Sequence, residues 1–554
     1  MVRASLTHGR LDRKLPAIIE TGLIALLVFT PAAFGCTHEV SSTAMVVGLY
    51  ALAILWMVRK LASRQRAPVA STPRRGWVGL WRRPSTYVYA FVLLAMVQLV
   101  PLPRAVVELL SPNRVALDEA FRVPSSSVPP WGGAPRFPAP PPSLTLSVYP
   151  HATRGELFRV IAYGVAFLIV TGCLRAEAPT RRILYAIVLI GAGMAALGLY
   201  QHRHWGTRIY RFWQSRYTRI PFGPYVNRNH FAGYMVMVGP LAFSVFVGHA
   251  FSRRRSLKGR RPHVDRPAPA GSGADRYRRY RPERGRPASW AHSVRGLFGL
   301  SSTRASARRR RHHRPEVRRW LIAVLGLCSA CTIVAALFAS LSRGGVVAFS
   351  AASVVFLALS ALRRWRLKRA LAVMVALVLM WGVGLHYGGQ RLRERFDQVD
   401  WSRAGRPHLW RGALRMCPDF PVFGVGLGCF EHAFPRYKPV ALGDQFFRAA
   451  HCDPLQAFVE MGALGAIAIV AMLGCIAVPA LRQIRGSRSR SGSWLLVGEL
   501  SGLSAMLAHS LVDFNLRIPA NALLFVVILG LTHNTARGLR LAQHYADTRA
   551  AAKV

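Results

Sequence analysis

Apolar and polar residues occur in long separate blocks along this chain. Apolar runs of about 17–25 residues, the length that crosses a bilayer as a helix, alternate with polar connections. Twelve such runs can be counted, and they begin near Ala17, Val40, Thr86, Leu157, Ile183, His230, Trp320, Gly344, Ala370, Pro454, Trp494 and Ile518. The pattern therefore predicts an all-α polytopic membrane protein with about 12 transmembrane helices.

Positive charge is concentrated in every second connection. The 554 residues include 74 Lys+Arg and 23 Asp+Glu, a net charge of +51, although 52% of the chain is hydrophobic. With the N-terminus in the cytoplasm, 50 of the 74 basic residues fall in the cytoplasmic segments 1–15, 59–85, 174–182, 252–319, 363–369, 482–493 and 534–554. This bias is the positive-inside rule and predicts an N-in/C-in topology. The charge therefore reports topology, and no nucleic acid partner is expected.

Three connections are long. Segment 252–319 holds 22 of the basic residues and little apolar periodicity, so it is predicted to be a disordered cytoplasmic loop that contacts anionic lipid headgroups. On the outer face, 103–155 is Pro-rich and 388–452 is partly helical in pattern. Three glycines spaced two apart from Gly424 onward predict a turn, because they lack the lysine and the strand–helix context of a nucleotide loop.

Cations and amides gather where the outer-face segments enter the membrane. Arg343 stands at the outer end of a predicted helix with two glycines behind it, which permit close approach to the backbone. Asn227 and Asn229 form a polar cap on the sixth apolar run, which begins near His230, and N-capping accounts for one of them. Arg406 and Trp410 are four residues apart and share one face of a predicted helix, where the arginine can fork onto a phosphate.

A histidine and several carboxylates follow in the same outer region. His451 stands just before a predicted helix, at the water boundary, where an imidazole can accept a proton. Glu460 is out of phase with His451 and shares a face with Gln456 instead, whereas Asp453 is nearer to the histidine in sequence. Asp513 lies beside the bilayer near the end of a later run, a costly position for a charge and often a functional one.

In their order along the chain, these segments resemble the O-antigen ligase and O-antigen polymerase superfamily of bacterial glycan-assembly membrane enzymes. The resemblance covers about residues 220–530 and is carried by Asn227 to Gly233, Ser342 to Gly345, Arg406 with Trp410, Pro421 to Phe430, Ala450 to Gln456, Glu460 to Gly465 and His509 to Asn521. It implies a GT-C-like glycosyltransferase that needs no metal and no cofactor. It also implies a site on the periplasmic or outer side of the bacterial cytoplasmic (inner) membrane.

The resemblance implies roles for particular residues. The donor is expected to be a glycan on undecaprenyl pyrophosphate, and the acceptor a hydroxyl of a lipid, glycan or protein. Arg343 and Arg406 are expected at the pyrophosphate, where cations can replace a divalent metal, and His451 at the acceptor hydroxyl. These three are the predicted catalytic residues. The predicted substrate-binding residues are Asn227, Asn229, Trp410, Asp453 and Asp513.

The chain is predicted to have three parts, namely helices one to five in 1–219, a ligase-like region in 220–530 and a cytoplasmic tail in 531–554. A secondary transporter of a small solute such as inorganic carbon is the alternative function, because such proteins often have twelve helices and a long central loop. The halves show no evident repeat, however, and polar residues gather at one face instead of the midplane. Ligation, polymerisation and protein O-glycosylation all stay open, because the acceptor cavity is expected to be built from unspecific apolar positions.

Overall fold

The structure is a computed structural model of the chain. It describes residues 2–64, 82–120, 141–206, 208–214, 220–251, 304–363, 367–397, 405–486 and 490–552. Two predicted features lie outside these residues, namely the greater part of the basic loop, 252–303, and the Pro-rich segment 121–140.

Each of the twelve apolar runs forms a helix. Ten of the described helices are long and apolar enough to cross a membrane, and they are α1 (Val2–Ala32), α2 (Glu39–Arg64), α7 (Pro150–Gly172), α8 (Glu177–His204), α9 (Arg228–Ala250), α10 (Arg304–Ala339), α11 (Arg343–Ala361), α12 (Leu367–Asp397), α15 (Asp453–Gly486) and α17 (Pro519–Ala551). The other two are α4 (Pro84–Val97), which is shorter, and α16 (Arg490–Ser510), which contains Glu499. The prediction of an all-α polytopic membrane protein is confirmed.

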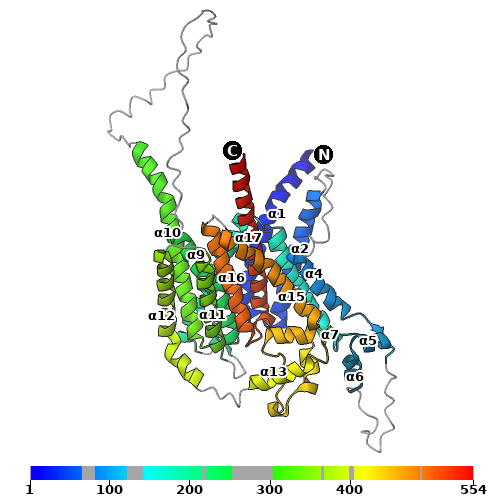
Figure 1. The fold of residues 1–554 in the computed structure, drawn as a ribbon. Coiled ribbons are helices and arrows are strands. Elements are labelled where there is room, and N and C mark those ends of the chain that lie inside the picture. The colour runs from blue at the N-terminus through cyan, green and yellow to red at the C-terminus, as the bar shows by residue number, and fades with distance from the viewer. Residues whose placement is uncertain are drawn as a thin grey trace, which may run out of the picture.

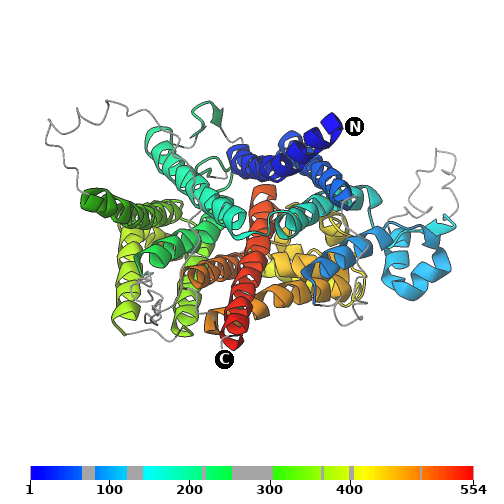
Figure 2. The same ribbon diagram turned by 90° about the horizontal axis from the view of Figure 1, so that it is seen from above.

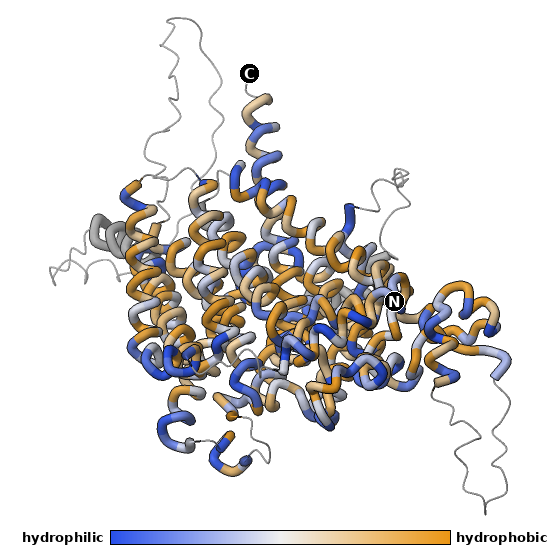
Figure 3. Tube along the Cα trace, turned by 60° about the horizontal axis from the view of Figure 1, so that its bottom comes forward, coloured by the Kyte–Doolittle hydropathy of each residue, from blue (hydrophilic) through white to orange (hydrophobic). Residues whose placement is uncertain are grey.

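The helices form one bundle with its apolar residues in a belt (Figure 1, Figure 3). The most enclosed is α9, since 94% of its apolar window is buried, and it packs against α8, α10, α11, α16 and α17. Figure 2 shows α17 (red) crossing the middle of the bundle, between the green helices and the blue helices α4 to α6. Both termini lie on one side, and α6 (Pro112–Ala120) and α13 (Gly405–Met416) lie on the opposite side (Figure 1).

Two predicted loops are shorter than expected because helices extend into them. α10 begins at Arg304, so the last 16 residues of the predicted disordered loop 252–319 are helical. α12 continues to Asp397, ten residues into the predicted outer loop 388–452. In both cases the helix carries on past the apolar run through arginines and alanine or leucine, which are good helix formers and can project their charge into water.

The remaining elements lie between these helices. They are η1 (Phe34–Cys36), β1 (Leu102–Pro103), α5 (Arg104–Leu110), β2 (Ser143–Leu144), β3 (Arg208–Ile209), β4 (Trp213–Gln214), α14 (Phe430–Ala433), η4 (Phe434–Tyr437), η5 (Val440–Leu442) and η6 (Asn515–Arg517). β1 pairs antiparallel with β2, and β3 pairs antiparallel with β4. These short ribbons connect helices and form no larger sheet.

Segment 405–459 has a hydrophobic core of its own. On α13 the apolar side chains of Leu409, Ala413 and Met416 recur at helical spacing and are buried together with Phe430 and Phe434. Fully burying each large side chain contributes about 1.5–3 kcal/mol. This core fixes α13, and therefore the residues on its other face, relative to the membrane helices.

Candidate functional site

The site is built around a break in α15. Gly462 has φ +61°, so the helix turns there, and the carbonyls of Val459 and Glu460 accept hydrogen bonds from Val425 N (2.9 Å) and Gly426 N (3.1 Å). A side chain on Gly424, where φ is +71°, would collide with the backbone of Glu460. The prediction that the glycine run forms a turn is confirmed, and the turn docks onto the broken helix.

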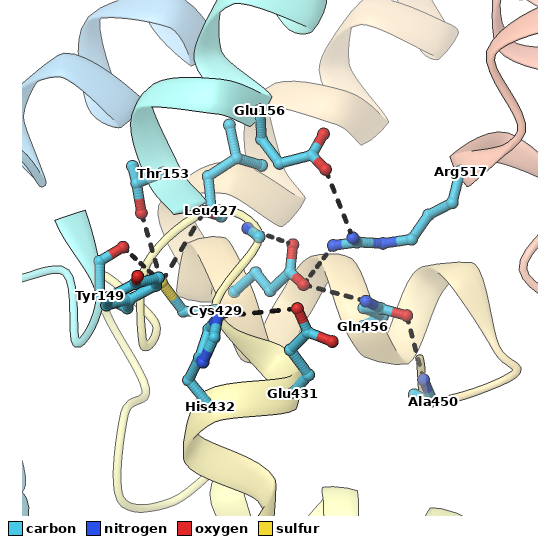
Figure 4. A network of polar contacts seen from close by, with 12 residues as sticks. Tyr149, Thr153, Glu156, Leu427, Cys429, Glu431, His432, Ala450, Gln456 and Arg517 are labelled. Carbon is cyan, nitrogen blue, oxygen red and sulfur yellow. Dashed lines mark hydrogen bonds and ion pairs between the residues drawn. The ribbon is translucent and has the colours of Figure 1, made fainter. Parts of the chain in front are cut away.

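Glu460 is the centre of a buried polar network. Figure 4 labels three other members of this network, namely Gln456, Arg517 and Glu156. Its carboxylate accepts hydrogen bonds from Gly428 N (2.9 Å) and from Gln456 Nε2 (2.9 Å). The prediction that Gln456 and Glu460 share one face of α15 is therefore confirmed. Arg517 of η6 donates to the same carboxylate and lies 3.8 Å from Glu156 of α7. Burial alone would lower the pKa of Arg517, but the two carboxylates raise it. The network therefore joins α7, α15, η6 and the glycine turn as one charged unit.

The same network presents His451. The N–H of Ala450 donates to Gln456 Oε1 (3.0 Å), and the C=O of Ala450 accepts from Trp410 Nε1 (3.0 Å). His451 itself has φ +51°, a left-handed conformation that costs a non-glycine residue roughly 1–2 kcal/mol. The side chains of Trp410 on α13 and Gln456 on α15 thus bind the C=O and the N–H of Ala450. These two bonds hold the strained His451, the next residue, in one position.

Replacing Gln456 tests this clamp. Gln456→Ala removes the bond to Ala450 N, so we expect kcat to fall by about tenfold while KM for either substrate changes little. Steady-state kinetics of the purified variant would give this split. The exposed Gln445→Ala is the matched control and should behave as wild type. An unchanged kcat for Gln456→Ala would show that the clamp has no part in presenting His451.

His451 and Arg406 meet at one buried carboxylate. Asp513 is 2% exposed and accepts from His451 Nδ1 at 3.3 Å through Oδ1. Its Oδ2 lies 3.7 Å from a terminal nitrogen of Arg406, whose other terminal nitrogen donates to Val512 O (2.6 Å). Because Nδ1 carries the proton toward Asp513, the opposite ring nitrogen of His451 is the one that can accept a proton.

The electrostatics of Asp513 favour its charged form. Burial alone would raise the pKa of Asp513, but the hydrogen bond from His451 and the nearby charges, including that of Arg406, lower it well below its ordinary value. Phe514 packs edge-on against the rings of both His451 and His230, with centroids 4.6 and 4.9 Å apart. The carboxylate therefore stays ionised and orients the imidazole.

A second cationic group lies where α9 and α11 begin and α12 ends. Arg343 donates to Arg395 O (3.0 Å), and Arg395 donates to Leu341 O (2.7 Å), so the two chain segments hold each other. Arg228 lies within electrostatic reach of both. Among the residues that the structure describes, none of these three arginines forms an ion pair with a carboxylate. Three guanidinium groups gathered at one place are suited to a multiply charged anion.

The two groups of cations approach one another at residues 509–512. A side chain on Gly344 would meet the imidazole of His509 at 3.0 Å and Val512 at 3.1 Å. Arg343 therefore comes to this segment from α11, and Arg406 comes to it from α13. His509 is 1% exposed, and its ring nitrogens have no hydrogen-bond partner among the described residues.

The predicted substrate-binding residues are largely engaged within the fold. Asn227 caps α9 by accepting from Asn229 N (2.9 Å), and Asn229 accepts from Ser342 Oγ (2.9 Å), which ties α9 to the start of α11. Asp453 accepts from Ser510 Oγ (2.8 Å) and Leu516 N (2.9 Å). Asp453 is nearer to His451 in sequence, but the hydrogen-bond partner of the histidine is Asp513. The turn after α16 brings Asp513 beside His451, although 62 positions separate the two residues in the chain.

Sequence reasoning did not select several residues of this region. Arg395 is one of five charged residues among the last seven residues of α12, 391–397, which the sequence pattern places in the loop 388–452. Arg517 stands in the segment that carries the resemblance, but its two carboxylate partners are far away in sequence. Only Arg395 left a local signal, namely a cation on the outer side, where orientation rules disfavour it.

A cavity of about 520 Å³ opens beside His451. Its walls come from η1 and the start of α2, from α7, from the cap of α9 and from residues 446–449 and 514–519. His451, His230 and Asn227 line it, together with the aromatic rings of Phe447 and Phe514. Within the described residues, no three His, Cys, Asp or Glu side chains are grouped in a way that would hold a metal ion.

The fold and this site define a multi-pass membrane protein with a cationic centre beside a histidine–aspartate pair. Residues 327–470 match the family model described as O-antigen ligase. Over this region the chain is similar to the O-antigen ligase and O-antigen polymerase superfamily, and the resemblance found in the sequence is confirmed there. The match contains Arg343, Arg406 and His451, whereas Asp513 lies beyond it. No curated protein matches the chain.

The family match over residues 327–470 bears on the general activity. It implies a glycosyltransferase-like membrane enzyme that acts on lipid-linked glycans. The ten apolar helices and the family together indicate a multi-pass bacterial membrane protein.

Proposed function

We propose that this protein transfers a glycan from undecaprenyl pyrophosphate to an acceptor hydroxyl at the outer face of the cytoplasmic membrane. The observation that carries this proposal is the convergence of His451 and Arg406 on Asp513, near three arginines that form no ion pair with a carboxylate of the described residues. A base and a cationic site are the two things that the reaction needs, because the hydroxyl is a weak nucleophile and the leaving group is a polyanion.

In the proposed reaction, the acceptor oxygen bonds to the anomeric carbon while the bond from that carbon to the pyrophosphate breaks. The proton of the hydroxyl passes to the free ring nitrogen of His451, and Asp513 stabilises the resulting imidazolium. The electron pair of the broken bond stays on undecaprenyl pyrophosphate. Arg343 and Arg406 bind that leaving group, and the chemistry proceeds through cationic stabilisation without a metal.

The position of Arg395 supports the donor assignment. Arg395 adds a cation beside Arg343. Its side chain donates a hydrogen bond to the carbonyl of Leu341, the residue that precedes Ser342 and Arg343 in the chain. Leu341, two residues before Arg343, has φ +55°, and His451 has φ +51°. Both proposed catalytic segments therefore contain a strained backbone position that neighbouring side chains hold in place. Such strain is characteristic of sites where geometry has to be fixed before the substrate binds.

Arg406 provides the test of this proposal. Arg406→Ala should lower kcat/KM for an undecaprenyl-pyrophosphate-linked donor by roughly 10²–10³-fold, because one stabilising donor to the leaving group is lost. Arg406→Lys should recover only a small part, since lysine cannot make two parallel bonds. The assay follows release of undecaprenyl pyrophosphate in proteoliposomes.

Arg411 is the matched control for Arg406. It lies on the same helix but is exposed, and Arg411→Ala should retain wild-type rates. If both variants were equally active, Arg406 would have no role at the donor. If wild-type protein released no undecaprenyl pyrophosphate with any acceptor, the proposed transfer itself would be wrong.

A further inference from the structure

We infer that the 520 Å³ cavity beside His451 is the acceptor site and that it receives an uncharged sugar unit. This inference rests on the proposed function and adds the place and the chemical class of the acceptor. It also assigns Glu39, at the start of α2, as a residue that binds the acceptor and determines specificity.

The cavity has the size and position that an acceptor requires. Its volume lies in the range of about 300–1,000 Å³ that is usual for small-molecule sites. His451 lines it, so a hydroxyl bound there reaches the proposed base. The donor arginines Arg343, Arg395 and Arg406 do not line it. Two substrates can therefore approach His451 from different sides, which a direct transfer between them requires.

The cations of the cavity differ from those of the donor group, because each already has a carboxylate partner. Arg159 lies 2.8 Å from Glu156, and Arg517 binds Glu460 and also lies 3.8 Å from Glu156. Arg448 is 86% exposed and lies 4.0 Å from Glu431. The positive charge of the wall is thus compensated by residues behind it, and a phosphate or carboxylate on the acceptor would gain little from entering.

The other lining groups are suited to hydroxyls. Glu39 lines the cavity, and its carboxylate forms no ion pair with any described residue. Asn227, Thr37 and Ser42 add amide and hydroxyl groups, whereas Phe447 and Phe514 supply flat apolar faces. A few polar groups that fix orientation, together with aromatic surface, are the features by which proteins bind polyols. An ionised carboxylate accepts strong hydrogen bonds from sugar hydroxyls and repels an anionic acceptor.

Glu39→Ala tests the inference. We expect KM for a neutral oligosaccharide acceptor to rise by about tenfold, the equivalent of one lost charge-assisted hydrogen bond, while KM for the undecaprenyl-linked donor changes less than about twofold. Glu39→Gln should recover part of the loss because it keeps the shape and one acceptor oxygen. Glu108, an exposed carboxylate on α5, is the matched control, and Glu108→Ala should match wild type.

The outcomes separate this inference from the proposed function. Wild-type transfer combined with an unchanged acceptor KM in Glu39→Ala, or with an effect on donor KM alone, would overturn the acceptor assignment and leave the transfer reaction in place. Wild-type transfer to serine or threonine peptides but not to neutral sugars would also overturn it. If the wild-type enzyme released no undecaprenyl pyrophosphate, the proposed function would fail first.

Discussion

His451→Ala should lower kcat for glycan transfer by roughly 10²–10⁴-fold, the usual contribution of a positioned general base. The loss follows because His451 lines the cavity while its Nδ1 contacts the carboxylate of Asp513, which leaves its other ring nitrogen to accept the proton of the hydroxyl. The measurement is the rate of product formation at saturating donor and acceptor. Donor binding, measured separately with a labelled undecaprenyl-linked glycan, should persist because the arginines are intact.

His408 is the control for this substitution. It lies on α13, two residues from Arg406, and has no hydrogen bond or ion pair to another described side chain, so His408→Ala should keep wild-type kcat. A folded His451→Ala protein with full activity would remove the base from the mechanism. The deprotonation would then have to come from another group or from solvent.

Asp513→Ala should destabilise the protein and abolish efficient transfer. Removing one partner of a buried charged pair costs about 3–5 kcal/mol, and we expect the lower end because 42% of the Arg406 side chain is exposed to solvent. His451 would also lose the acceptor that fixes its ring. The midpoint of thermal unfolding in detergent and the transfer rate should both fall. The exposed Asp444→Ala should change neither.

The pH dependence of stability provides a second test of Asp513. Its folded-state pKa is lowered below the ordinary value of 3.8, so the carboxylate contributes stability at neutral pH, and that contribution is lost as pH falls below 3.8. The difference in unfolding midpoint between wild type and Asp513→Asn should therefore shrink between about pH 7 and about pH 3. A constant difference over this range would contradict the charged interaction with His451 and Arg406.

Helix positions could be predicted from the sequence, but helix ends could not. The apolar runs fixed where each helix lies because a bilayer leaves the backbone no other way to satisfy its hydrogen bonds. The ends at Arg304 and Asp397 were missed because charged residues with high helix propensity continue a helix beyond the membrane. A hydropathy pattern reports where the apolar run stops and does not report where the helix stops.

The site was predictable where its residues carry local chemistry. Arg343, Arg406 and His451 stand out individually, as an outer cation or an interfacial imidazole does. The pairing of His451 with Asp513 was not predictable, because 62 residues separate them and Asp453 is only two residues away. Likewise, Arg395 and Glu39 become candidate site residues only through their neighbours on other helices. The spacing of residues along one segment does not reveal such neighbours.

The most direct test of the account measures both products of one reaction. Wild-type protein in proteoliposomes is given a defined undecaprenyl-pyrophosphate-linked glycan and a neutral oligosaccharide acceptor, with chelator added, and released undecaprenyl pyrophosphate and extended acceptor are counted together. The account predicts equal amounts of the two, with both lost in His451→Ala. Release of undecaprenyl pyrophosphate without an extended acceptor, or uptake of a small solute with no donor present, would contradict it.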